Sequence, residues 1–287
     1  MLSLKIKNSI EKLLGLSISS SQSCSGGSIN DAYLLKTAKG VFFLKQNSGT
    51  IAFDLLRAEV EGLNTLSSVD GIRVPNILSE GKVENTVFLL LEFIPPGRKS
   101  DSFWAQFGLT LARLHRCTDE CFGFSSDNYI GALPQYNPSF EHWIDFYREA
   151  RLHPQLEMAK QQNKLLPKDE RSFERLFAKW HNYFPEERPA LTHGDLWSGN
   201  FLCNEAEKVV LIDPAVSYAH REMDIAMTYL FGGFSTTFYE SYQAHFPLAP
   251  CFEERLALYQ LYYLMVHVNL FGGSYLQSVR RILKKYV

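Results

Sequence analysis

One polar segment in the second half of the chain restricts the possible folds more than any other feature. It runs from Leu191 to Asn200 with the central letters H-G-D-L-W-S-G-N, and an apolar run after it ends at Asp213. A His-Gly-Asp tripeptide alone is more often a capped turn with a structural Asp than a functional site. Asn200 and Asp213, however, offer an amide and a carboxylate oxygen, the ligands that Mg²⁺ prefers. The segment therefore predicts a catalytic loop with a metal site beside Asp195.

The spacing of Asp195, Asn200 and Asp213 resembles the catalytic loop of protein kinases. Those enzymes carry H-R-D, an Asn five residues after the Asp, and a further Asp at the end of the following strand. Gly194 stands here in place of Arg, a form that resembles the small-molecule branch of that fold. Because phosphoryl transfer depends on positioning and on neutralising phosphate charge, we expect Asp195 to orient the acceptor hydroxyl and to take its proton late. Asn200 and Asp213 would bind Mg²⁺, and Asp224 is predicted to cap a helix or to hold the loop backbone.

The first third of the chain predicts a small antiparallel sheet with one helix. Residues 17–46 alternate apolar and polar side chains between turn signals and predict three strands. Apolar residues recur at helical spacing over 53–66, and the strongly apolar run 87–93 suits a central strand. The double proline at 95–96 ends that run, so we expect one lobe over 1–94 and a second over 95–287.

Helical patterns dominate the second lobe. They cover 103–115, 143–160, 173–183, 224–229 and 252–271, with short strands near 201–203 and 209–212. The chain is therefore predicted to be α+β, with a protein-kinase-like arrangement of a small antiparallel β-sheet lobe and a larger, mainly helical lobe.

The sheet lobe supplies candidate nucleotide-binding residues. Lys45 ends the third predicted strand, where a kinase-like fold places the lysine that reaches the α- and β-phosphates of ATP, and Glu59 on the next helix could pair with it. A lone strand Lys is otherwise a solvated edge residue, and Glu61 competes for the pairing. Gly26 and Gly27 could turn over the phosphates, although without a G-x-G-x-x-G pattern they equally suit any hairpin.

The end of the central strand is the expected hinge between the lobes. Glu92, Phe93 and Ile94 come directly before the double proline, and their backbone would meet the adenine ring. A plain strand end is the alternative, because backbone contacts leave no mark in a sequence.

With these residues in hand, the chain resembles the fructosamine kinase (ketosamine-3-kinase) family over nearly its whole length. The resemblance is carried by G-G-S-I-N-D-A-Y at 26–33, F-L-K at 43–45, A-E-V-E-G-L at 58–63, L-A-R-L-H at 111–115, F-G-F at 122–124, D-N-Y-I-G at 127–131, P-Q-Y-N at 134–137 and H-G-D-L-W-S-G-N at 193–200. The W-S-G insert is the most specific piece, because it separates the family from aminoglycoside and choline kinases.

The resemblance implies an aminoglycoside-phosphotransferase-like fold and a defined reaction. The γ-phosphate of ATP, with Mg²⁺, would pass to the 3-hydroxyl of a ketosamine, the adduct of a sugar with an amine. Phosphorylation makes the adduct labile, so the implied role is deglycation repair of glycated protein lysines or of small glycated amines. Some members with a Cys at the position of Ser28 form redox-sensitive dimers, and that behaviour does not carry over to Cys24.

Four further residues are candidates for the sugar pocket. Aromatic faces and amide groups suit a polyol, so Trp197, Asn128, Gln135 and Asn137 could frame it. Packing in the core is the competing explanation for each.

Composition excludes several other classes of protein. A net charge of −2 with scattered Lys and Arg gives no field for nucleic acid. The most apolar late stretch, 256–271, is interrupted by Gln260, His267 and Asn269 and predicts a buried helix rather than a membrane span. Five cysteines form no CxxC pair or zinc spacing, and the start of the chain has no signal-peptide pattern, so we expect a cytoplasmic enzyme.

Two rival functions stay open at this level. The first is the same chemistry on another acceptor, such as an aminoglycoside or choline. The second is a noncatalytic nucleotide-binding scaffold, which the presence of Lys45, Asp195, Asn200 and Asp213 disfavours. Either a monomer or a homodimer is compatible with the sequence.

Overall fold

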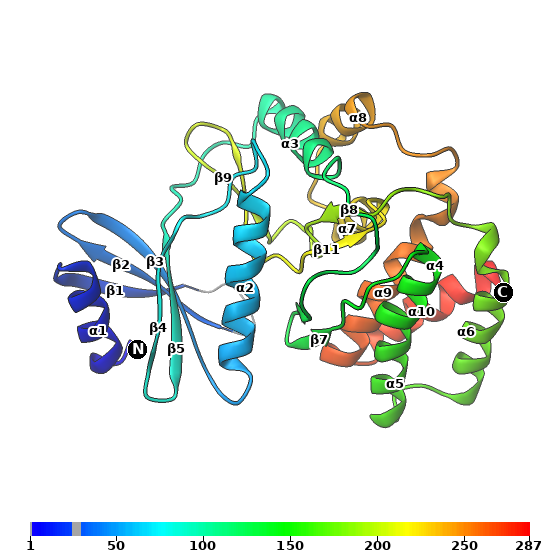
Figure 1. The fold of residues 1–287 in the computed structure, drawn as a ribbon, viewed down its shortest axis with the longest axis horizontal. Coiled ribbons are helices and arrows are strands. Elements are labelled where there is room, and N and C mark those ends of the chain that lie inside the picture. Colours follow the sequence, from blue (N-terminus) through cyan, green and yellow to red (C-terminus); the bar gives the residue numbers. More distant parts are fainter. Residues whose placement is uncertain (1, 25–29) are drawn as a thin grey trace.

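The computed structural model describes residues 2–24 and 30–287 and has two unlike halves (Figure 1). The first half is a single antiparallel sheet in the order β1-β2-β3-β5-β4, with one helix on each face. Its elements are α1 (Leu4–Leu14), β1 (Ile18–Cys24), β2 (Asp31–Thr37), β3 (Gly40–Ser48), α2 (Ala52–Ser67), β4 (Ile77–Val83) and β5 (Thr86–Glu92). The predicted three-strand meander and the following helix are confirmed.

Strand β5 is covered on both faces, which explains why its sequence is apolar without alternation. Phe88 and Leu90 belong to the cluster under α1, whereas Leu89 and Leu91 belong to the cluster under α2. Successive side chains of a strand point to opposite faces, so both helices draw apolar residues from one strand. The prediction of a central strand is confirmed, since β5 lies between β3 and β4.

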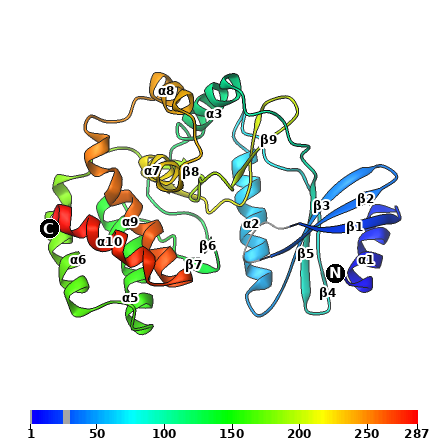
Figure 2. The same cartoon turned by 180° about the vertical axis from the view of Figure 1, so that it is seen from behind.

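The second half is built mainly from helices (Figure 2). They are α3 (Asp101–Leu114), α4 (Trp143–Phe146), α5 (His153–Gln161), α6 (Pro167–Lys179), α7 (Glu222–Phe231), α8 (Thr236–His245), α9 (Phe252–Phe271) and α10 (Ser274–Tyr286). Three two-stranded ribbons join them: β6 (Asn128–Ile130) with β7 (Leu133–Gln135), β8 (Ala190–Thr192) with β11 (Ser217–Ala219), and β9 (Phe201–Cys203) with β10 (Val209–Leu211). The two-lobed kinase-like fold class is thus the observed one, while the lobe boundary after Ile94 stays a prediction.

Helix α9 is the central helix of this half. It packs against α5, α7 and α10, and most of its side chains are buried. A helix that is apolar on nearly all sides belongs in a core, so the predicted buried helix is confirmed. Within the described ranges, no helix combines the length and apolarity that a membrane crossing requires.

The structure departs from the predicted continuous helix over 143–160. A π-helical turn at Tyr147–Leu152 separates α4 from α5. The turn buries the side chains of Tyr147 and Arg151. The Tyr147 hydroxyl donates to the carbonyl oxygens of Leu258 and Tyr259 in α9. Such turns commonly mark a local demand on side-chain placement that helical periodicity does not reveal.

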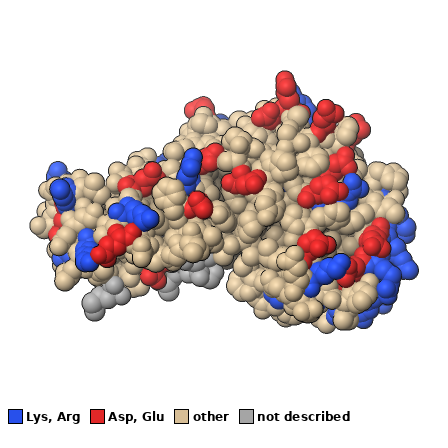
Figure 3. Space-filling view, turned by 60° about the horizontal axis from the view of Figure 1, so that its bottom comes forward, with Lys and Arg blue, Asp and Glu red and all other residues tan. Residues whose placement is uncertain are grey.

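Charged side chains of both signs are interleaved over the face shown in Figure 3. This distribution fits the near-zero net charge of the sequence. On that face, no broad area of one sign of charge is visible among the described residues. That the protein does not bind nucleic acid stays a prediction.

Candidate active site

The segment between β8 and β9 is a loop fixed by its own histidine. The Nε2 atom of His193 donates to the carbonyl oxygen of Ile212 at 3.0 Å, and its Nδ1 atom accepts from the backbone N–H of Asp195 at 3.3 Å. Burial lowers the pKa of His193, so the ring is neutral with its hydrogen on Nε2. His193 therefore ties the loop to Ile212, the residue after β10.

Gly194 explains why the Arg of the protein-kinase loop is replaced here. Its φ is +83°, and a Cβ atom would lie 1.9 Å from the carbonyl oxygen of Ala215. Any side chain would both clash and strain the backbone. The loop geometry next to Asp195 thus requires glycine.

A buried carboxylate holds this loop from below. Asp224, in the first turn of α7, accepts from the backbone N–H groups of His193 at 2.7 Å and Gly194 at 2.9 Å, and from the ring of His115 at 3.1 Å. Burial would raise the pKa of Asp224, but the bonds from His115 and His193 outweigh it and hold the pKa below its usual value. The prediction that Asp224 supports the loop backbone is confirmed.

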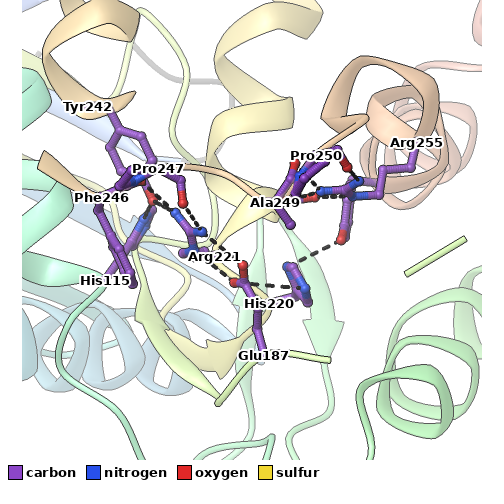
Figure 4. A network of polar contacts seen from close by, with 12 residues as sticks. His115, Glu187, His220, Arg221, Tyr242, Phe246, Pro247, Ala249, Pro250 and Arg255 are labelled. Atoms are coloured by element: carbon purple, nitrogen blue, oxygen red, sulfur yellow. Dashed lines mark hydrogen bonds and ion pairs between the residues drawn. The ribbon is translucent and has the colours of Figure 1, made fainter. Parts of the chain in front are cut away.

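The support of Asp224 continues into a polar network under α7 (Figure 4). Arg221 donates to the Tyr242 hydroxyl at 3.1 Å, and that hydroxyl lies 2.7 Å from Nδ1 of His115. A guanidinium only donates, so the Tyr242 O–H points to His115, whose hydrogen on Nε2 then points to Asp224. Glu187 completes the network with two hydrogen bonds of 2.8 Å from Arg221.

We expect Glu187→Ala to lower the free energy of unfolding by about 3 kcal/mol, because it leaves a buried guanidinium without its carboxylate. The Arg221 side chain is 4% exposed. Urea unfolding at pH 7 measures the loss, and Glu186→Ala is the matched control because Glu186 is exposed. An equal change in both variants would contradict the role assigned to the pair.

The ion pair of Arg221 with Glu187 also makes the free energy of unfolding depend on pH. Burial would raise the pKa of Glu187, but Arg221 outweighs it and holds the pKa below the ordinary 4.5. A lowered pKa stabilises the fold at pH values above 4.5, and this stabilisation is lost as the pH falls below that value. The difference between wild type and Glu187→Ala should therefore shrink in acid.

Asp195 projects from the loop into a cavity of about 570 Å³ that both halves of the molecule line. Its Oδ2 atom and its carbonyl oxygen each accept from the Asn200 amide nitrogen at 2.9 Å. Burial, with the nearby charges of Asp213 and Asp224, raises the pKa of Asp195 to about 7 although the Asn200 bond opposes it. A carboxylate with a pKa near neutrality is suited to exchange a proton with a hydroxyl group.

Lys45 reaches the opposite wall of this cavity. Its neighbour Leu44 packs under α1, so Lys45 points to the α2 face of the sheet, where its ammonium lies 2.6 Å from Glu59 and also contacts Asp213. Burial would lower the pKa of Lys45, but the two carboxylates outweigh it and raise the pKa. Lys45 is therefore a fixed positive charge facing Asp213.

The predicted pairing of Lys45 with Glu59 is confirmed, and the rival partner is engaged elsewhere. Glu61 accepts hydrogen bonds from the hydroxyls of Ser125 and Ser126. The structure thus brings six of the predicted site residues to the lining of one cavity: Lys45, Glu59, Asp195, Trp197, Asn200 and Asp213.

Three other predicted pocket residues do not line this cavity. Asn128, Gln135 and Asn137 are buried and hydrogen-bond to one another and to the carbonyl oxygens of Ala215 and Val216. Their amides support the chain that follows Asp213, so packing accounts for them better than contact with a sugar. Within this segment it is Tyr129, Ile130 and Gly131 that line the cavity.

The residues of the predicted hinge do not line the cavity. The Glu92 side chain accepts two hydrogen bonds from Arg73, at 2.6 and 2.5 Å, and Ile94 is buried. Among the residues assigned to the cavity wall, neither these two nor Phe93 is found. Contact of their backbone with adenine stays a prediction, and Gly26 and Gly27 lie outside the described residues.

Several residues that line the cavity were not predicted from the sequence, because they lie on the C-terminal helices. They are Met227, Phe231, Tyr263, Val266, His267, Leu270, Phe271 and Tyr275. One signal was available: His267 interrupts the most apolar stretch of the chain. A polar residue in an otherwise buried helix calls for an explanation, and the cavity supplies it.

Comparison with known proteins places these features in a family. A family model described as fructosamine kinase matches residues 2–287. An Enterococcus faecium protein described as "Probable ketoamine kinase" is 38% identical over 263 residues, covering 91% of this chain and 93% of that protein. A rice protein (Oryza sativa subsp. indica) described as "Protein-ribulosamine 3-kinase, chloroplastic" is 36% identical over 272 residues, covering 92% of this chain and 78% of that protein.

Solved structures agree with the sequence relatives. A Thermobifida fusca protein described as a fructosamine-3-kinase superposes with a TM-score of 0.87 at 32% identity, covering 97% of both chains. The aminoglycoside phosphotransferase APH(4)-Ia superposes with a TM-score of 0.65 at 14% identity, covering 99% of both chains. The second likeness concerns the fold alone.

Proposed function

The chain belongs to the fructosamine kinase family, and from this membership and the cavity we propose that it transfers the γ-phosphate of ATP to the 3-hydroxyl of a ketosamine. The observation that carries the proposal is the meeting of Asp195 and Asn200 with Lys45 and Asp213 in one cavity. The acceptor oxygen bonds to the γ-phosphorus, the bond from that phosphorus to the bridging oxygen of ADP breaks, and the acceptor proton passes to Asp195.

Lys45 is placed to hold the phosphates of ATP. Its ammonium is kept protonated by Glu59 and Asp213, and it lines the cavity from the sheet side. A charge fixed by its neighbours needs no reorganisation when the nucleotide arrives. Lys45 thus sets the position of the phosphate chain relative to Asp195.

The residues present fit Mg²⁺. The Asn200 amide nitrogen is occupied by two bonds to Asp195, which turns the amide oxygen away from Asp195 and leaves it to a cation. The Asp213 side chain is 42% exposed and lines the cavity. Bound through these two oxygens and the phosphates, Mg²⁺ would neutralise charge that develops during transfer.

The acceptor side of the cavity favours a ketosamine over a polycationic antibiotic. Among the described lining residues the carboxylates are Glu59, Asp195 and Asp213, and the first and third contact Lys45. A multiply charged aminoglycoside would need a set of free carboxylates, whereas a ketosamine carries one ammonium group. We therefore propose a small glycated amine or a glycated protein lysine as acceptor, and deglycation repair as the role.

Release of ADP across an acceptor panel tests this function. We expect turnover with ribulose-lysine, fructose-lysine and a ribulose-glycated protein, with NMR locating the new phosphate on O3, and no turnover with aminoglycosides or choline. If only another acceptor reacts, the assignment as a kinase stands but the assignment of a ketosamine as the acceptor is wrong. ATP binding without any transfer would instead support the noncatalytic scaffold.

A further inference from the structure

Four rings form a continuous wall on the helical side of the cavity, which we name the aromatic rim. It consists of Phe231, His267, Phe271 and Tyr275, contributed by α7, α9 and α10. His267 lies at its centre, with ring centroids 4.9 Å from Phe231, 4.9 Å from Tyr275 and 5.5 Å from Phe271. The rim adjoins the catalytic loop, because the Phe231 ring also meets Trp197 at 6.4 Å.

The rim is more exposed than the helices that carry it. Phe231 is 40% and Phe271 is 57% exposed, although each ends a helix that is otherwise largely buried. Grouped exposed aromatic rings that line a cavity beside a catalytic carboxylate are typical of a ligand contact. Core packing therefore does not account for these two side chains.

The hydrogen of the His267 ring is fixed by its own helix. The Nδ1 atom lies 2.7 Å from the carbonyl oxygen of Tyr263, and since a carbonyl only accepts, Nδ1 carries the hydrogen. Burial lowers the pKa of His267, which keeps the ring neutral. Its Nε2 atom is then a hydrogen-bond acceptor, and no partner for it is found among the described residues.

Ring faces and a bare imidazole nitrogen suit one ligand chemistry. An ammonium group is attracted by aromatic faces and donates hydrogen bonds. A ketosamine has a secondary ammonium on C1. The nitrogen is four bonds from the oxygen on C3 that receives the phosphate, which corresponds to a distance of about 4–5 Å. Its alkyl substituent would extend further along the rim.

We propose that the aromatic rim binds the amine half of the ketosamine, with the secondary ammonium among its rings and donating to Nε2 of His267. This inference rests on the proposed function and deepens it. It assigns His267 and Phe271 to recognition of the amine, while Asp195 acts on the sugar hydroxyl. The acceptor is then selected by its amine as well as by its sugar.

A pair of substrates isolates the ammonium contact. One is the ribulosamine of an alkylamine, and the other is the ether in which oxygen replaces the amine nitrogen, with the same sugar and alkyl group. We expect wild type to prefer the amine in kcat/KM by about tenfold or more, a preference that His267→Phe and Phe271→Ala reduce several-fold through the KM of the amine. The KM for ATP should stay unchanged.

Two further variants complete the test. His267→Gln restores an acceptor atom and should recover part of the preference that His267→Phe loses. His245→Phe is the matched control, because His245 makes the same Nδ1 contact with the carbonyl four residues earlier, at 2.8 Å, but lies exposed on α8. It should leave both substrates unaffected.

The possible results distinguish an error in the assignment of the aromatic rim from an error in the proposed kinase function. An unchanged preference for the amine in His267→Phe and Phe271→Ala, in an enzyme that phosphorylates ketosamines, overturns the inference alone. Equal losses on amine and ether also overturn it, since they indicate a structural effect. Failure of wild type to phosphorylate either compound overturns the proposed function together with the inference.

Discussion

Asp195→Asn is expected to lower kcat by roughly 10³-fold while leaving the affinity for ATP and Mg²⁺ within about twofold. The amide has the size of the carboxylate, and its oxygen can still accept from the Asn200 nitrogen that now lies 2.9 Å from Oδ2. It cannot take the proton of the acceptor hydroxyl. Turnover is therefore lost while the binding geometry survives.

Single-turnover kinetics and nucleotide titration check this expectation separately. The pattern that supports the assignment is a slow chemical step with normal ATP binding. Asp119→Asn is a suitable control, since Asp119 is an exposed carboxylate that does not line the cavity. Full activity in the Asp195 variant would remove that residue from the mechanism.

Much of this site could be predicted because its residues lie close together in the sequence. Asp195 and Asn200 lie on one loop, and Asp213 directly follows the β9–β10 hairpin after it, so their spacing in the sequence reflects the geometry. The Lys45–Glu59 pair could be predicted because a strand and the following helix bring them together. Short-range patterns of this kind can be recognised in a single sequence without an alignment.

The acceptor side could not be predicted in the same way. The aromatic rim joins the ends of α7 and α9 to α10, and its four rings are ordinary helix residues until the fold brings them together. Conversely, Asn128 and Gln135 are polar for an internal reason, since they satisfy the carbonyl oxygens of Ala215 and Val216. A polar side chain near a catalytic segment can satisfy buried backbone groups or bind a ligand, and its burial in the structure distinguishes the two roles.

Helix α8 and the ribbon of β8 with β11 also escaped prediction, for a related reason. Each strand of the ribbon has three residues, too few for a two-residue alternation to be recognised. Helix α8 has an interrupted apolar pattern because only Phe238 and Tyr242 are buried, and both pack with α3. These elements are stabilised mainly by tertiary contacts, and their local sequence alone does not specify them.

Asp213→Asn is expected to remove most of the gain in ATP affinity that Mg²⁺ provides and to lower kcat by roughly a hundredfold or more. Asp213 has a φ of +52°, a region that Asn tolerates better than Ala, so this change isolates the charge from backbone strain. Glu59 remains 2.6 Å from Lys45, which keeps its ammonium paired.

Nucleotide titration with and without Mg²⁺ measures the metal-dependent part of binding directly. In wild type, ATP should bind more tightly with Mg²⁺, whereas in Asp213→Asn the two affinities should converge. Binding without the metal should change little or improve, because a carboxylate next to the phosphates is lost. A variant that retains the full response to Mg²⁺ would show that the ion is held elsewhere, and the arrangement of Lys45, Asp213 and Asn200 would then need another explanation.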